Sequence, residues 1–130
     1  MCIFCKIING EIPSYKIYEN EKVYAFLDIA KDADGHTLVI PKKHVTSIVD
    51  ADSETLKDVM DGIKVITDHY ISLGYDGVNV MNASGEAAEQ SVFHLHFHII
   101  PRKKDDEMHT WPNLPGAKEE LSEIHKKLKI

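Results

Sequence analysis

The sequence contains few cysteines, no long apolar run and little clustered positive charge. Its two cysteines stand at positions 2 and 5 of 130 residues, too close together and too near the start to cross-link the fold. No apolar stretch approaches the roughly 20 residues of a membrane span, and no signal-peptide pattern opens the chain. The net charge of −6 argues against a general nucleic-acid or acidic-membrane surface. We therefore expect a cytoplasmic protein that binds neither nucleic acid nor membranes.

The composition is that of an ordinary globular protein, with 43% hydrophobic and 28% charged residues. A chain of 130 residues can bury a hydrophobic core without cross-links. We expect one domain over residues 1–130, with a core at 1–102 and a C-terminal extension at 103–130.

The order of apolar and turn-forming residues predicts an α+β fold. Strands are expected at residues 16–19, 23–27, 36–40 and 77–82 and across the histidines at 94–99. A long helix is expected over residues 53–73, capped by Asp50 or Asp52. Its core-facing stripe is Leu56, Val59, Met60, Ile63, Ile66, Tyr70 and Leu73. With short helices expected at 3–8 and 118–129, the strands at hairpin spacing favour a five-stranded antiparallel sheet.

The most informative stretch is His94-Leu95-His96-Phe97-His98-Ile99, in which histidines alternate with apolar residues. Such alternation predicts a strand with the apolar side chains on a core face and the imidazoles on the other face. At about 3.3 Å of rise per residue, successive imidazoles would be about 7 Å apart. Each ring brings a donor and an acceptor, so three on one face are costly to bury without a function.

Two kinds of chemistry fit these histidines. They could hold a catalytic zinc with one position left for water. Alternatively, one histidine could attack phosphorus while its neighbours fix its tautomer. The covalent route is favoured by neutral polar residues just upstream that suit phosphate oxygens, namely Asn82, Ser84, Gln90 and Ser91. Glu86 and Glu89 could serve as a base beside a metal, so a metal-dependent hydrolase or lyase stays open.

The stretch from Gln90 to Ile100 resembles the signature of the histidine triad (HIT) nucleotide hydrolases and transferases, His-φ-His-φ-His-φ-φ with φ apolar. Further segments match in the expected order: Phe26-Leu27-Asp28-Ile29, Gly35-His36-Thr37-Leu38-Val39-Ile40-Pro41-Lys42 and Met81-Asn82. The resemblance implies a HIT fold, a purine nucleotide substrate and a homodimer that pairs through helix and strand.

The resemblance also implies roles for individual residues. His96 would attack the α-phosphorus to give a nucleotidyl-histidine that water cleaves, and His98 and His36 would flank it. The phosphate and leaving group would contact Asn82, Gln90 and Ser91. The ribose hydroxyls would bind Asp28, because a carboxylate can accept from both. The base would lie against Phe4, Ile7, Phe26, Ile29 and Leu38.

Zinc-bearing members of this superfamily join an N-terminal Cys-x-x-Cys to two histidines. The corresponding residues of this sequence are Cys2, Cys5, His44 and His94. A complete Cys₂His₂ set leaves no open position, so the resemblance implies one structural zinc per chain and no metal for catalysis. A redox role for the two cysteines is disfavoured, because no strand precedes them.

The implied reaction releases a nucleoside monophosphate, expected to be AMP, from a nucleoside phosphoramidate or a dinucleoside polyphosphate. A slow-turnover regulatory nucleotide-binding protein is the alternative within the family. Glu89 stands where the family usually has glycine, which puts the leaving-group preference in question. The histidines outside every matching segment, His69, His109 and His125, are expected at the surface.

Overall fold

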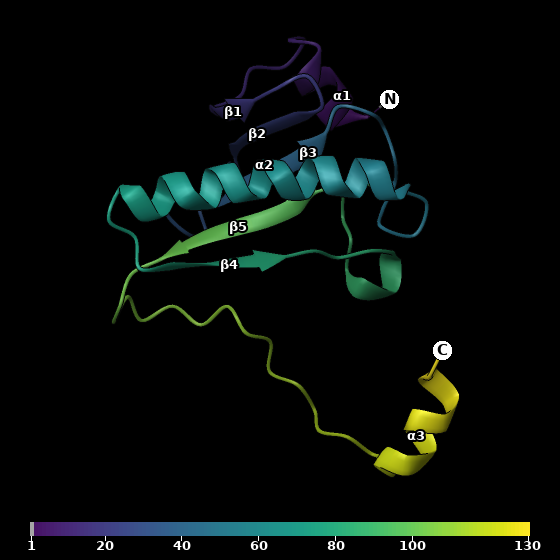
Figure 1. The fold of residues 1–130 in the computed structure, drawn as a ribbon. Helices are drawn as coiled ribbons and strands as arrows, with labels where there is room; N and C mark the ends of the chain where they lie inside the picture. The colour runs from purple at the N-terminus through teal and green to yellow at the C-terminus, as the bar shows by residue number, and fades with distance from the viewer. Residues whose placement is uncertain (1) are drawn as a thin grey trace.

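The computed structural model describes residues 2–130, in which five strands form one antiparallel sheet in the order β1-β2-β3-β5-β4 (Figure 1). The strands are β1 (Lys16–Glu19), β2 (Val23–Leu27), β3 (Thr37–Pro41), β4 (Gly77–Met81) and β5 (Phe97–Arg102). The helical elements are α1 (Ile3–Ile8), α2 (Ser53–Ser72), the 3₁₀ turn η1 (Glu86–Ala88) and α3 (Leu121–Leu128). The expected α+β class and five-stranded antiparallel sheet are confirmed.

The sheet separates two apolar clusters, because alternate residues of a strand point to opposite faces. On one face α2 lies across the sheet (Figure 1) and packs its Val59, Ile63, Ile66 and Tyr70 against strand residues that include Val39 and Ile99. On the other face α1 packs its Phe4 and Ile7 against Tyr24, Phe26, Leu38 and Ile40. His98 is paired with Leu38 and Met81, so it shares the α1 face.

Helix α2 begins at the expected residue, and its cap is Asp52, whose side chain accepts from the backbone N–H of Thr55 at 2.8 Å. Two residues expected in its core stripe, Met60 and Leu73, are 50% and 60% exposed. Leu73 is the C-cap residue and lies past the last turn that the sheet covers. Met60 lies at the edge of the apolar stripe of α2, and the sheet covers only the middle of that stripe.

The strand expected across the histidines begins later than predicted. Strand β5 starts at Phe97, so of the three alternating histidines only His98 belongs to it. The backbone N–H of Leu95 donates to the carbonyl of Val45 at 2.7 Å, a bond outside the sheet ladder that diverts the chain before β5. The ring centroids of His96 and His98 are therefore 5.0 Å apart instead of about 7 Å.

Beyond β5 the chain leaves the sheet as an extended segment that leads to α3, well away from the other elements (Figure 1). The start of this segment is anchored by Arg102, whose guanidinium donates to the Asp106 carboxylate and to Asn79 Oδ1, each at 2.8 Å. Glu120 has extended backbone, so α3 begins three residues later than the expected residue 118. No helix within residues 2–130 is both long enough and apolar enough to cross a membrane.

Candidate active site

A pocket of about 380 Å³ opens beside the histidines on the α1 face of the sheet. Its wall includes every residue expected to contact a base, namely Phe4, Ile7, Phe26, Ile29 and Leu38. It also includes apolar residues that the sequence did not single out, among them Ile3, Ile12, Pro13 and Val92. Polar groups enter from Asp28, Ser91, His96 and His98. An apolar wall with a few convergent polar groups is typical of a small-molecule site.

The protein backbone sets the tautomer of His96. Its Nδ1 lies 2.8 Å from the carbonyl oxygen of His94, and because a carbonyl only accepts, we assign the proton to Nδ1. The other nitrogen of the neutral ring, Nε2, then keeps its lone pair. The ring is 6% exposed and meets Phe4 edge to face, with the centroids 5.2 Å apart. A positioned imidazole with a free lone pair can act as a nucleophile.

His36 and His98 form a hydrogen-bonded pair next to His96. His36 Nε2 and His98 Nδ1 are 2.8 Å apart, and His36 Nδ1 is 2.7 Å from Asp32 Oδ1. Asp28 Oδ2 lies 3.7 Å from His36 Nε2. Burial, reinforced by the neighbouring His96 and His36, lowers the pKa of His98 to about 4. His98 is therefore neutral at neutral pH and can accept a proton.

Gly35 places His36 directly before β3. Its φ of +82° is readily adopted only by glycine, and an added Cβ would lie 2.7 Å from a side-chain carbon of Pro101. The turn thus brings the chain close to β5, where His36 contacts His98 of that strand.

Four potential metal ligands converge near the start of the chain. His94 Nδ1 lies 3.4 Å from Cys2 Sγ, 3.6 Å from Cys5 Sγ and 3.0 Å from His44 Nδ1, and Cys5 Sγ lies 3.4 Å from His44 Nδ1. His94 Nε2 donates to the carbonyl of Pro41 at 2.8 Å, which leaves the Nδ1 lone pair for the cluster. Tetrahedral zinc, with bonds of about 2.3 Å to sulfur and about 2.05 Å to nitrogen, would set a sulfur and a nitrogen about 3.6 Å apart, close to the three sulfur–nitrogen distances here. It would set two nitrogens about 3.3 Å apart, slightly more than the 3.0 Å between His44 and His94. The donor set fits zinc.

Comparison with known proteins connects this geometry to a family. The sequence pattern of the HIT domain matches residues 9–105. The chain belongs to the HIT domain family.

Relatives share both sequence and fold with this HIT domain. An uncharacterized HIT-like protein of Methanocaldococcus jannaschii is 50% identical over 106 residues, which cover 82% of each chain. An adenosine 5'-monophosphoramidase of Saccharomyces cerevisiae is 41% identical over 129 residues, 98% of this chain and 80% of the relative. The crystal structure of a histidine triad nucleotide-binding protein from Candida albicans matches with a TM-score of 0.83 and 38% identity, over 99% of this chain and 95% of that one.

Two residues that the HIT resemblance assigned to phosphate are engaged by the protein itself. Gln90 is buried; its Oε1 accepts from the backbone of Gly85 at 2.8 Å, and its Nε2 donates to two backbone carbonyls at 2.7 and 2.9 Å. Asn82 Nδ2 donates to the carbonyl of His96 at 2.9 Å. These side chains hold the loop and the His96 backbone, and their expected contact with the phosphate stays a prediction. Ser91 is exposed at the pocket.

Glu89 occupies a left-handed conformation at the end of η1, with a φ of 69°, and its side chain is exposed. A residue with a Cβ costs about 1 kcal/mol there relative to glycine. The departure from the family's glycine is therefore accommodated as local backbone strain. The expected surface positions of His69, His109 and His125 are confirmed.

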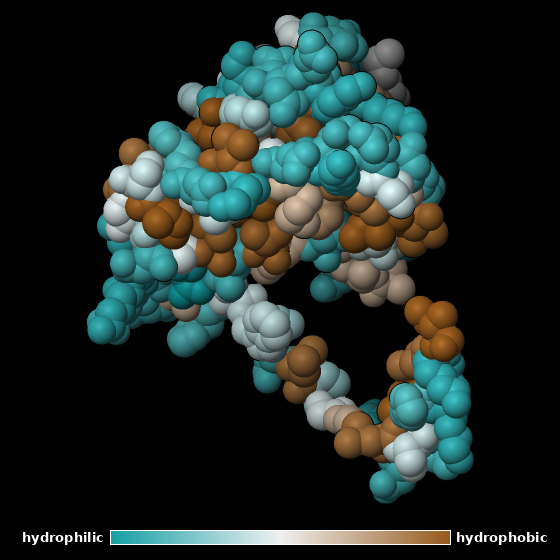
Figure 2. Space-filling view, viewed as in Figure 1, coloured by the Kyte–Doolittle hydropathy of each residue, from teal (hydrophilic) through white to brown (hydrophobic). Residues whose placement is uncertain are grey.

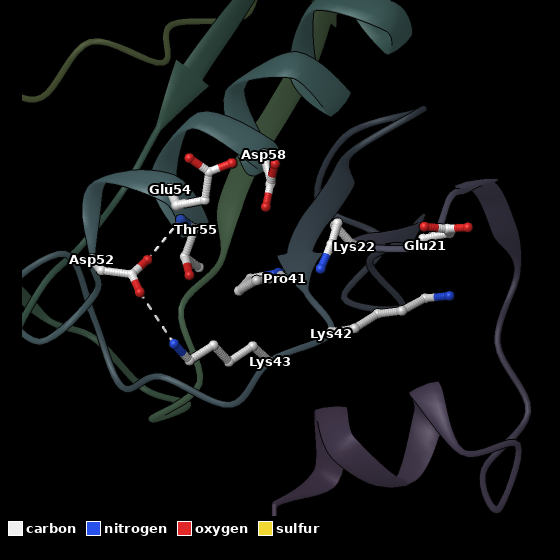
Figure 3. A pocket seen from close by; sticks show the side chains of 9 residues that line it. All are labelled: Glu21, Lys22, Pro41, Lys42, Lys43, Asp52, Glu54, Thr55 and Asp58. Carbon is white, nitrogen blue, oxygen red and sulfur yellow. Dashed lines mark hydrogen bonds and ion pairs between the residues drawn. The ribbon is translucent and has the colours of Figure 1, made fainter.

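A second hollow, of about 310 Å³, lies between the end of β3 and the start of α2 (Figure 3). Its charged lining consists of Glu21, Lys22, Lys42, Lys43, Asp52, Glu54 and Asp58. Asp52 accepts from Thr55 and from Lys43 Nζ, and these contacts lower its pKa to about 2. This hollow carries four acids and three lysines, and its lining within residues 2–130 holds neither histidine nor thiol. We therefore place the candidate active site at the apolar pocket.

Proposed function

We propose that this HIT domain is a hydrolase that releases a nucleoside monophosphate, AMP where the nucleoside is adenosine, from a nucleoside phosphoramidate or a dinucleoside polyphosphate. The observation that carries the proposal is the His96 ring at an apolar pocket, with its Nδ1 proton committed to a backbone carbonyl. The S. cerevisiae relative, which is 41% identical, bears the name adenosine 5'-monophosphoramidase, and this supports the reaction class.

The reaction proceeds in two displacements at one phosphorus. The base lies against the apolar wall and Asp28 accepts from the ribose hydroxyls. Nε2 of His96 bonds to the α-phosphorus while the bond from phosphorus to the leaving amine breaks, and the amine takes up a proton from solvent. Water then bonds to the same phosphorus, the bond to His96 breaks and AMP leaves. His98, which is neutral, receives a proton from that water.

Adenosine phosphoramidate in which the α-phosphorus is made chiral with two oxygen isotopes, hydrolysed in water enriched in the third isotope, tests this function. We expect AMP formation with retention of configuration, because two in-line displacements each invert the centre. The product is measured by ³¹P NMR after stereochemical analysis. AMP formed with inversion would overturn the covalent route in favour of direct attack by water. A protein that binds AMP but forms none from the phosphoramidate would favour a regulatory nucleotide-binding protein.

The arrangement of the histidines disfavours one metal held by all three. His94 directs its Nδ1 lone pair to the cysteine cluster, whereas His36 is the hydrogen-bond partner of His98. We propose instead a structural zinc held by Cys2, Cys5, His44 and His94. Such an ion fills its four positions with protein ligands and would tie α1 to the segments that follow β3 and precede β5.

We also propose that the protein forms a homodimer through α2 and β4. Strand β4 is an edge of the sheet, and its Val80 pairs with Ile99, which places both side chains on the α2 face. Val80 is 42% exposed and Met60 on α2 is 50% exposed. Figure 2 shows apolar side chains gathered along α2 on the face where β4 lies. A second copy would cover this face and pair the free edge.

A charge placed on this face is expected to produce a monomer. Val80→Asp would bury a carboxylate between two apolar surfaces, so light scattering coupled to size exclusion should report half the mass of the wild type. Val65→Asp is the matched control, because Val65 is similarly exposed but lies about 140° around α2 from Met60. A Val80→Asp dimer, or a monomeric wild type, would contradict the proposed interface.

A further inference from the structure

Asp32 lies outside the pocket but is joined to it by two hydrogen bonds. Its Oδ1 is 2.7 Å from His36 Nδ1, and His36 Nε2 is 2.8 Å from His98 Nδ1. The Asp32 side chain is 58% exposed, in the loop between β2 and β3, whereas His36 is 8% exposed. Of these three residues, His98 lines the apolar pocket of the candidate active site. Asp32 can therefore influence the reaction only through the two imidazoles.

The carboxylate fixes the direction of both hydrogen bonds. The hydrogen bond from His36 lowers the pKa of Asp32, so this group is ionised and can only accept. His36 then carries its proton on Nδ1, and its Nε2 accepts from the Nδ1–H of His98. His98, in turn, keeps an unprotonated Nε2. If Asp32 were absent, His36 could carry its proton on Nε2, which would reverse the tautomer of His98.

We propose that Asp32 is a positioning residue that selects the tautomers of His36 and His98, and thereby leaves His98 Nε2 as the base for water attack on the nucleotidyl-His96 intermediate. The proposal deepens the hydrolase function and rests on it. A carboxylate four residues before the histidine, bonded to its Nδ1, is a feature of this loop that the HIT signature does not contain.

The same carboxylate offsets the charge that develops in the hydrolytic step. The water proton moves to His98 Nε2 as the water oxygen bonds to phosphorus and the phosphorus–nitrogen bond to His96 breaks. The resulting imidazolium donates toward His36, which faces the ionised Asp32. The titratable groups that face the imidazole pair are Asp28 at the end of β2, Asp32 in the loop and His96 before β5.

Histidine ¹⁵N NMR of the ligand-free protein reads the tautomers directly. In the wild type we expect Nδ1–H on both His36 and His98. In Asp32→Ala we expect the His36 proton to move to Nε2 and the His98 proton to follow. Asp32→Asn retains an acceptor oxygen without the charge, so it should keep the wild-type pattern. Asp34→Ala is the matched control, because Asp34 is an acid of the same loop and makes no side-chain hydrogen bond to a histidine within residues 2–130.

The turnover of the Asp32 variants should depend on the tautomers of His36 and His98 and on the charge at position 32. We expect kcat to fall about tenfold in Asp32→Ala, below the roughly 100-fold to 10,000-fold effect of a general base, because water screens the exposed carboxylate. Asp32→Asn should recover part of this loss, and AMP affinity should stay within about twofold, because Asp32 does not line the apolar pocket. The acidic limb of the rate profile should move to lower pH in both variants, because the Asp32 carboxylate raises the pKa of His98 and its charge is lost in both.

Unchanged ¹⁵N signals in Asp32→Ala would overturn the proposal, even if the wild type is an active hydrolase. Equal losses of kcat in Asp32→Ala and Asp34→Ala would overturn it too, because the effect would then be a general one of loop charge. A reversed His98 tautomer in Asp32→Ala, together with a wild type that releases no AMP, would instead overturn the hydrolase function and leave the role of Asp32 in setting the tautomers intact.

Discussion

His96→Ala is expected to abolish nucleotidyl transfer while nucleotide binding persists. The substitution removes the lone pair that bonds to phosphorus in the proposed mechanism, so kcat should fall by at least about 10⁴-fold. The apolar wall and Asp28 remain, and the affinity for AMP should stay within about threefold, since the nucleophile acts mainly in the transition state. Intact mass spectrometry in acid-free buffer, soon after mixing with adenosine phosphoramidate, should show an adenylate adduct in the wild type and none in the variant.

Two further variants serve as controls for the His96→Ala result. His96→Asn retains a side-chain donor for the carbonyl of His94, so it separates loss of the nucleophile from loss of the hydrogen bond at 2.8 Å. His69→Ala removes an exposed histidine of α2 and should leave both adduct and turnover unchanged. Full hydrolysis by a folded His96→Ala variant, or an adduct that survives in it, would rule out His96 as the nucleophile.

Removing zinc is expected to lower thermal stability strongly without stopping the chemistry. An ion present at a thousand times its dissociation constant stabilises the native state by about 4 kcal/mol, which corresponds to a Tm shift of about 10–15 °C for a chain of this size. Elemental analysis should find about one zinc per chain, and chelation should lower the Tm measured by calorimetry under reducing conditions. Turnover at a temperature where the chelated protein is still folded should persist.

Cys5→Ala should reproduce the loss of stability and make the protein insensitive to the chelator. The matched control is His109→Ala, which removes an exposed histidine outside the cluster and should keep both metal content and Tm. A metal-free protein with the wild-type Tm would contradict the structural zinc. Loss of turnover on chelation, with the fold intact, would point to a metal-dependent hydrolase.

Local sequence patterns predicted most of the elements. The helix at Ile3–Ile8 and the strands at Lys16–Glu19 and Val23–Leu27 have the expected bounds, and α2 begins at the predicted Ser53. Each depends on neighbours within a few residues: a turn, a cap or the alternation of apolar side chains. The same alternation correctly predicted burial of Leu95 and Ile99.

The extent of the histidine strand could not be predicted from alternation. His94 and His96 follow the alternation of histidine with apolar residues. However, the backbone N–H of Leu95 donates to the carbonyl of Val45, so the hydrogen-bonded strand begins only at Phe97. The alternation also implied that three imidazoles share one face. In the structure His94 joins Cys2 and His44, residues 92 and 50 positions away in the chain.

The sequence by itself determined the kinds of chemical group, their order and most of the secondary structure, because periodicity and caps act between near neighbours. Only the tertiary structure decided which nitrogen of each histidine carries the proton. His96 donates to a carbonyl of its own segment, His94 donates to Pro41 across the fold, and His98 donates to a histidine 62 residues away. For His94 and His98 the tautomer follows from a distant partner that packing brings within about 3 Å, and that partner is not encoded in any local pattern.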